Sequence, residues 1–111
     1  MARIRLARTA ETDLDDIWRY SVSTWGLEQA ERYTALIEKA FHRLLDNPYI
    51  GRARPDVHKG YRALPVAKHV IFYTVSTDTI DVLGIPHERM DARRHLAGEG
   101  PPTEAEGTAA G

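Results

Sequence analysis

Residues 49–97 contain most of the side chains that can hold a phosphate or transfer a proton. This half of the chain has eight basic and five acidic residues, and four of the chain's five histidines. The side chains of interest are Arg52, Arg54, His58, Lys59, Arg62, Lys68, His87, Arg89, Arg93, Arg94 and His95. Cations bind phosphates and histidines transfer protons near neutral pH, so a small ribonuclease would use such a set. The alternative is a solvated rim with local ion pairs, such as Arg89 with Asp91.

His87, Glu88, Asp91 and His95 raise the question of a metal site. On a helix, His87 and Asp91 would be i,i+4 neighbours, as would Asp91 and His95. Pro86, however, makes His87 a residue of a strand end or turn, and the spacing matches no zinc or iron motif. We therefore interpret Asp91 as a helix cap and expect neither a metal nor another cofactor.

A helix is predicted to begin near Thr9, which can cap it, and to end at Gly26. We interpret its acids as solvated residues near the positive end of the helix; they are Glu11, Asp13, Asp15 and Asp16. Trp18 and Trp25 lie on its apolar stripe, which predicts core packing. Trp18 is also a candidate for lining a groove that binds a partner.

Length and composition indicate one globular domain without membrane spans. A chain of 111 residues fits one domain, and no apolar run approaches the ~20 residues that span a bilayer. The N-terminus alternates charge and apolarity, unlike a signal peptide, and the absence of cysteine suits the cytoplasm. We expect a domain over residues 1–97 and a disordered, acidic segment rich in Gly, Pro and Ala over residues 98–111.

Hydrophobic periodicity predicts an α+β fold. The expected order is a strand over residues 4–7, two helices that form an antiparallel hairpin around Gly26, and a loop over residues 49–60. Three strands over residues 61–66, 69–76 and 79–85 follow, and then a helical turn over residues 91–97. The hairpin is expected to cover one face of a mainly antiparallel sheet, while both faces of the strand over residues 69–76 are apolar.

Four short signatures occur in a fixed order along this layout. They are Trp25-Gly26 with Gln29-Ala30 and Tyr33; Asn47-Pro48 with Gly51-Arg52; His69-Val70-Ile71-Phe72-Tyr73; and Pro86-His87-Glu88-Arg89-Met90-Asp91 with Arg94-His95-Leu96. In this order the chain, from about Ile4 to Leu96, resembles the ParE toxins of bacterial toxin–antitoxin pairs, within the RelE/ParE superfamily. The resemblance implies the same fold, with an N-terminal strand, a helical hairpin and a three-stranded meander completing one sheet.

The resemblance also implies partners. ParE toxins are associated with poisoning DNA gyrase, and a ParD antitoxin neutralises them by folding a flexible segment along the toxin. The toxin would then contact DNA only indirectly, through gyrase or the antitoxin, and it would not bind a membrane. Candidates for the toxic surface are His87, Arg89, Arg93, Arg94 and Arg62. Candidates for the antitoxin surface are Tyr61, Leu64, Ile71, Tyr73, Leu83, Ile85 and Trp18, on the expectation that one sheet face is left open.

Two other functions are compatible with these residues. One is a RelE-like, ribosome-dependent mRNA endonuclease, which the basic half and its histidines favour. The C-terminal segment has no tyrosine after Tyr73, and this disfavours a nuclease site. Gly84 and Pro86 stand where the ParE pattern predicts an arginine and an aliphatic residue. This departure leaves open a decayed toxin that only binds its antitoxin.

Overall fold

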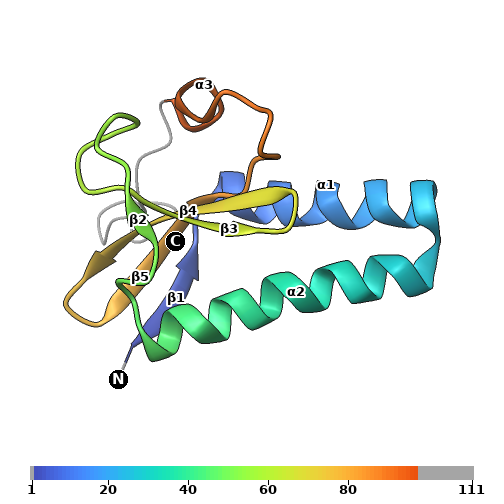
Figure 1. Ribbon diagram of the computed structural model, residues 1–111, viewed down its shortest axis with the longest axis horizontal. Coiled ribbons are helices and arrows are strands. Elements are labelled where there is room, and N and C mark those ends of the chain that lie inside the picture. The colour runs from blue at the N-terminus through green and yellow to red at the C-terminus, as the bar shows by residue number, and fades with distance from the viewer. Residues whose placement is uncertain (1, 98–111) are drawn as a thin grey trace.

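The apolar runs of the sequence form one five-stranded sheet with helices on both sides in the computed structural model, which describes residues 2–97 (Figure 1). The elements are β1 (Arg3–Leu6), α1 (Arg8–Trp25), α2 (Leu27–Asp46), β2 (Arg52–Ala53), β3 (Arg62–Val66), β4 (His69–Ser76), β5 (Thr79–Gly84) and α3 (Ala92–Leu96). The predicted fold class is confirmed. The segment over residues 98–111, predicted to be disordered, lies outside the described residues.

The sheet has the strand order β1-β5-β4-β3-β2. The three-stranded meander β3-β4-β5 is antiparallel, and β1 pairs in parallel with β5 at its edge. The two-residue strand β2 pairs with β3, although the sequence predicts only a loop there. Two residues are too few to show the alternation that predicts a strand. Strand β2 forms only because β3 lies alongside and pairs with it.

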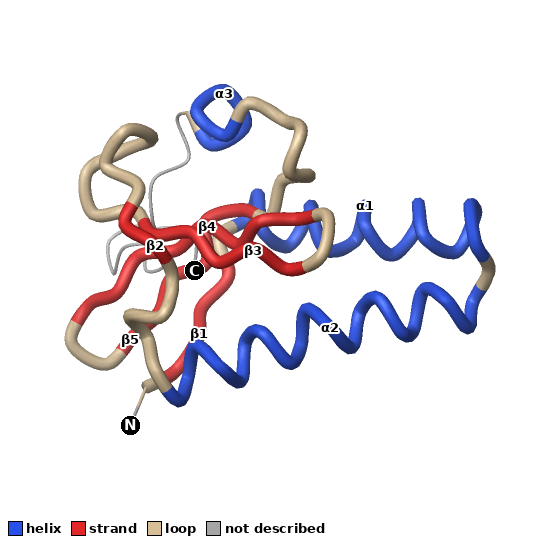
Figure 2. Tube along the Cα trace, in the orientation of Figure 1, coloured by secondary structure: helices blue, strands red, loops and turns tan. Residues whose placement is uncertain are grey.

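The helical hairpin forms around Gly26, whose φ of 92° is the left-handed conformation that favours glycine. Figure 2 shows α1 and α2 projecting together beyond the sheet. The expected Thr9 cap is wrong, because α1 begins at Arg8 and its N-cap is Ala7, without a side-chain cap. The Ala7 N–H donates to the Val82 carbonyl at 2.9 Å, so pairing with β5 keeps the chain extended up to this residue.

Each face of the sheet carries its own apolar cluster. The face toward the hairpin buries Ile71 and Tyr73 against residues such as Ile37 and Leu44 of α2. The opposite face buries Phe72 together with Tyr61, Ala63 and Leu83. Leu96 of α3 belongs to the same cluster, and the loop over 54–60 helps to cover it. Within residues 2–97, neither face of the meander is left bare, because α3 and the loop over 54–60 close the second one.

The prediction of an open antitoxin surface on the sheet is therefore wrong for six of its residues. Tyr61, Leu64, Ile71, Tyr73, Leu83 and Ile85 are all buried within the chain, at no more than 6% exposure. They also do not share a face, since Tyr61 and Leu83 lie in the cluster under α3 and the other four lie in the cluster under the hairpin. Alternation along a strand identified the apolar positions but could not show that the chain's own helices cover them.

Helix α3 is fixed by its cap and by one close contact. The Asp91 carboxylate accepts the N–H groups of Arg93 and Arg94, which confirms Asp91 as a cap. A Cβ at Gly84 would lie 2.5 Å from Leu96 Cδ2, so the glycine makes room for α3 to approach β5. This contact is a structural reason for glycine at a position where the ParE pattern predicts arginine.

Candidate functional site

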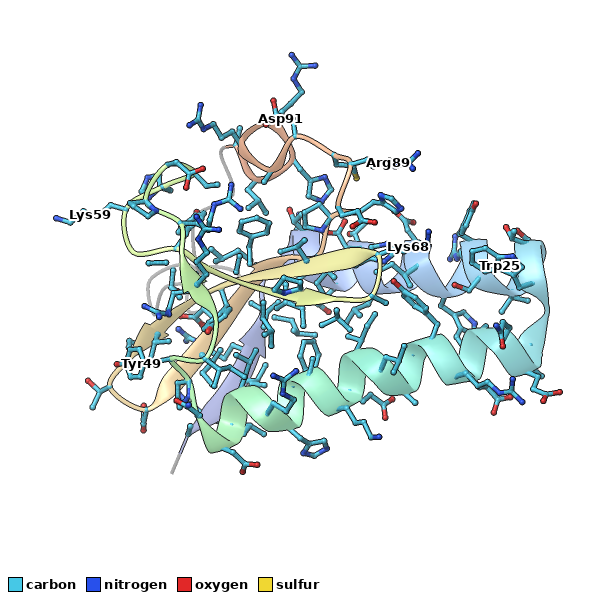
Figure 3. The ribbon with its side chains drawn as sticks, in the orientation of Figure 1. Trp25, Tyr49, Lys59, Lys68, Arg89 and Asp91 are labelled. Atoms are coloured by element: carbon cyan, nitrogen blue, oxygen red, sulfur yellow. The ribbon has the colours of Figure 1, made fainter. Side chains whose placement is uncertain are left out.

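A pocket of about 500 Å³ lies where α1, α2, the β3–β4 turn and the segment after β5 meet. Its lining is formed by Asp13, Asp16, Ile17, Tyr20, Ser21, Trp25, Tyr33, Lys68, His69, Ile85, Pro86, His87, Arg89, Met90 and His95. Figure 3 shows Lys68 and Arg89 close to the α1 side of the molecule, far from Lys59 on the opposite loop. The three histidines come from three separate parts of the chain and meet only in the folded protein.

His69 is held in place by the hydroxyl of Tyr33. The Lys68 backbone N–H donates to Tyr33 Oη at 3.0 Å, and Tyr33 Oη lies 2.7 Å from His69 Nδ1. The hydroxyl accepts the Lys68 N–H and shares the second hydrogen bond with Nδ1, so it fixes the orientation of the ring. Burial lowers the pKa of His69, and the neighbouring His87 lowers it further.

His87 is oriented by a backbone group. The Arg89 N–H donates to His87 Nδ1 at 3.1 Å, so the neutral ring of His87 carries its hydrogen on Nε2. The two rings pack edge to face, with centroids 5.3 Å apart. Backbone bonds from Val70 to Pro86 and from Glu88 to Lys68 hold the segment after β5 beside β4.

The third histidine, His95, is bound to Asp13. His95 Nε2 lies 2.8 Å from Asp13 Oδ2, and the same carboxylate accepts the Ile85 N–H at 2.7 Å. The interpretation of Asp13 as a solvated helix acid is therefore wrong, because its side chain is buried and joins α1 to β5 and α3. The position of Asp13 in the sequence could have indicated its burial. It lies three residues after Ala10 and four before Ile17, on the buried stripe of α1.

Two aromatic side chains stand at the hairpin end of the pocket. Tyr20 and Trp25 are 61% and 56% exposed, and their rings pack edge to face with centroids 5.7 Å apart. The prediction that Trp25 packs in the core is wrong, because the end of α1 extends past the sheet, as Figure 2 shows. Trp18 is half-buried and lines a second, smaller groove between α1 and α2, about 350 Å³ in volume.

The structure brings together part of the predicted toxic surface. His87 and Arg89 line the pocket, and Arg93 and Arg94 follow them on α3, where Arg93 Nε donates to the Asp56 carbonyl at 2.7 Å. Arg62 lies elsewhere. It pairs with Tyr73 at the end of β3 away from His69, about 13 Å along the strand. Its guanidinium donates to the carbonyls of Gly51 and Tyr49.

The pocket therefore offers hydrogen-bond donors and cations beside apolar walls. His69 Nδ1 is hydrogen-bonded to Tyr33 Oη and His87 Nδ1 accepts the Arg89 N–H, so both rings are fixed in orientation. Within residues 2–97, no group of three or more His, Cys, Asp or Glu side chains is placed to hold a metal ion. No helix among the described residues combines the length and apolarity needed to cross a membrane.

Sequence reasoning missed Tyr33, His69, Trp25 and Asp13 as members of this site. Tyr33 and His69 both occur in the signatures, but nothing in the sequence indicates that they meet. They are 36 residues apart in sequence, and only the packing of α2 against β4 places their polar atoms in contact.

Comparison with known proteins gives the same family on sequence and on structure. Residues 4–92 match the family described as the ParE toxin of type II toxin–antitoxin systems, parDE. The chain is 40% identical over 96 residues to toxin ParE1 of Mycobacterium tuberculosis, covering 86% of this chain and 98% of that protein. It is 36% identical over 96 residues to toxin ParE1 of Caulobacter vibrioides, covering 86% and 99%.

A solved structure described as the chromosomal ParDE toxin–antitoxin system from P. aeruginosa is also similar. The TM-score is 0.68 at 26% identity, over 78% of this chain and 96% of that one. The fold and the matched sequence define a toxin of the type II toxin–antitoxin class. The chain belongs to the ParE family of these toxins.

Proposed function

We propose that this ParE-family toxin inhibits DNA gyrase by binding it and is neutralised by a ParD-like antitoxin. The observation that carries the proposal is the family match over residues 4–92, together with the similarity to a structure described as a ParDE system. Target binding by a protein surface needs exposed side chains, and the described residues offer a cationic set near one pocket. No bound cofactor is required for this activity.

We assign the target surface to His87, Arg89, Arg93 and Arg94. Arg89, Arg93 and Arg94 are exposed, and all four follow β5 on one continuous segment. Gyrase works on DNA, so a cationic surface beside its cleaved DNA complex is electrostatically favourable. Arg62 is half-buried and bonded to two carbonyls, so we assign it a structural role in holding the loop that precedes β2.

A supercoiling assay with purified gyrase tests the proposal. We expect the chain to inhibit supercoiling and to increase the amount of cleaved DNA, and the double variant Arg89→Ala, Arg94→Ala to do so less. The matched control is Arg19→Ala, an exposed arginine on α1 that is ion-paired with Asp15 at 3.0 Å. Unchanged supercoiling with no cleaved DNA would contradict gyrase inhibition.

The ribosome-dependent endonuclease is less well supported by the site. RelE-like ribonucleases often use a tyrosine near the sheet, and this chain has no tyrosine after Tyr73. Primer extension on cellular messages distinguishes the two, because codon-positioned cuts with normal supercoiling would favour the nuclease. Normal growth on induction without an antitoxin would instead indicate a decayed toxin.

The antitoxin half of the proposal is tested separately. A small neighbouring reading frame with a ribbon-helix-helix pattern is the expected antitoxin, and co-expression should restore growth and yield a co-purifying complex. Failure of the two proteins to associate would contradict this assignment even if gyrase were inhibited.

A further inference from the structure

We propose that the histidine pocket receives one carboxylate and an adjacent large apolar side chain from the antitoxin. This inference rests on the proposed function, since it assigns the docking position of that partner. It replaces the sheet surface that the sequence predicts, because six of those residues are buried. The pocket is defined by Lys68, His69, His87 and Arg89 on one side and by Ile17, Tyr20 and Trp25 on the other.

The apolar side of the pocket suits a large side chain. Tyr20 and Trp25 remain more than half exposed, although aromatic side chains of this size gain the most from burial. Met90, at 49% exposure, adds a flexible apolar group at the same opening. Exposed aromatic residues beside a pocket are typical of interface anchors, which dominate binding energy.

The opposite side of the pocket offers charge to a carboxylate. Lys68 and Arg89 are exposed and, among residues 2–97, neither makes an ion pair. The Nε2–H group of His87 adds a donor, because its Nδ1 accepts the Arg89 N–H. A carboxylate accepts several such hydrogen bonds at once, and bonds to a charged acceptor are the stronger kind.

The acids of the pocket limit the charge of the occupant. Asp13 is already bonded to His95 and the Ile85 N–H, whereas Asp16 is exposed on the wall formed by α1. Glu88 also acts electrostatically on His69 and Tyr33, so the acids of this region largely offset the charges of Lys68 and Arg89. This favours a single carboxylate of a peptide over a phosphate or a nucleic acid strand, which would bring more negative charge close to Asp16.

Binding titrations of the antitoxin with one charge-reversed variant and one truncated aromatic variant of the toxin test the inference. The probe is the purified antitoxin from the neighbouring reading frame, and the variants are Lys68→Glu and Trp25→Ala. Lys39→Glu is the matched control, because Lys39 is an exposed residue of α2 outside the pocket. We expect about tenfold weaker binding for Lys68→Glu, about thirtyfold weaker binding for Trp25→Ala, and unchanged binding for the control.

The outcomes separate this inference from the proposed function. Tight binding by the wild type with equal affinities for Lys68→Glu, Trp25→Ala and the control would overturn the docking position and leave the antitoxin assignment intact. Loss of gyrase inhibition without any loss of antitoxin binding would assign the pocket to the target instead, and would also overturn it. No binding by the wild type would overturn both. Circular dichroism melts confirm that each variant is folded.

Discussion

Removal of the Asp13 carboxylate is the most informative single change to the protein. The carboxylate accepts the Ile85 N–H at 2.7 Å and binds His95 at 2.8 Å, and its side chain is buried. In Asp13→Ala the buried N–H loses its acceptor, which costs about 1–3 kcal/mol. Loss of the His95 bond adds about 1–2 kcal/mol, and the better helix propensity of alanine returns about 0.5 kcal/mol.

The expected loss for Asp13→Ala is therefore about 1.5–4.5 kcal/mol of unfolding free energy. At about 4–5 °C per kcal/mol for a domain of this size, it corresponds to a fall in Tm of about 6–22 °C. Asp13→Asn retains an acceptor for the Ile85 N–H and should lose less. Thermal unfolding by circular dichroism measures all three proteins, and Asp16→Ala, an exposed acid on the same helix, is the control. A difference below about 0.5 kcal/mol between Asp13→Ala and Asp16→Ala would refute the proposed coupling of α1 to β5 and α3.

Three further changes test other parts of the structure. Gly84→Ala should cost about 1–3 kcal/mol because its Cβ meets Leu96, and a smaller amount in a Leu96→Ala background; equal costs in urea titrations would contradict the contact. Tyr73→Phe should cost about 2–3 kcal/mol in the same assay, since the buried hydroxyl bonds two backbone groups at 2.8 Å; a cost near zero would show that water replaces it. Burial lowers the pKa of His69, so the unfolded chain binds more protons and stability should fall as pH drops below about 6.5. His69→Gln should flatten this dependence of Tm on pH, while His42→Gln, at an exposed position, should leave it unchanged.

The locations of the elements could be predicted from the sequence because each depends on local chemistry. Apolar spacing marked both helices, Gly26 marked the turn between them, and Asp91 marked the start of α3. The two-residue strand β2 could not be predicted, because it exists only where β3 offers it a partner. The start of α1 was placed wrongly for a similar reason, since pairing with β5 extends β1 to its last residue.

Some residues of the candidate site could likewise be recognised from the sequence, and others only from the structure. His87 and Arg89 could be recognised from their types and their place after the last strand, but their partners could not. Tyr33 was indistinguishable from a core residue and Asp13 from a solvated acid until packing brought each of them to a histidine.

The sequence by itself determined the family, the order of helices and strands, and the apolar character of the meander, because motifs and periodicity are properties of neighbouring residues. Only the tertiary structure decided what covers that meander and where an open surface remains. The free energy of burial depends on the neighbours that folding brings together, and here α3 closes the sheet face while the pocket beside Trp25 stays open.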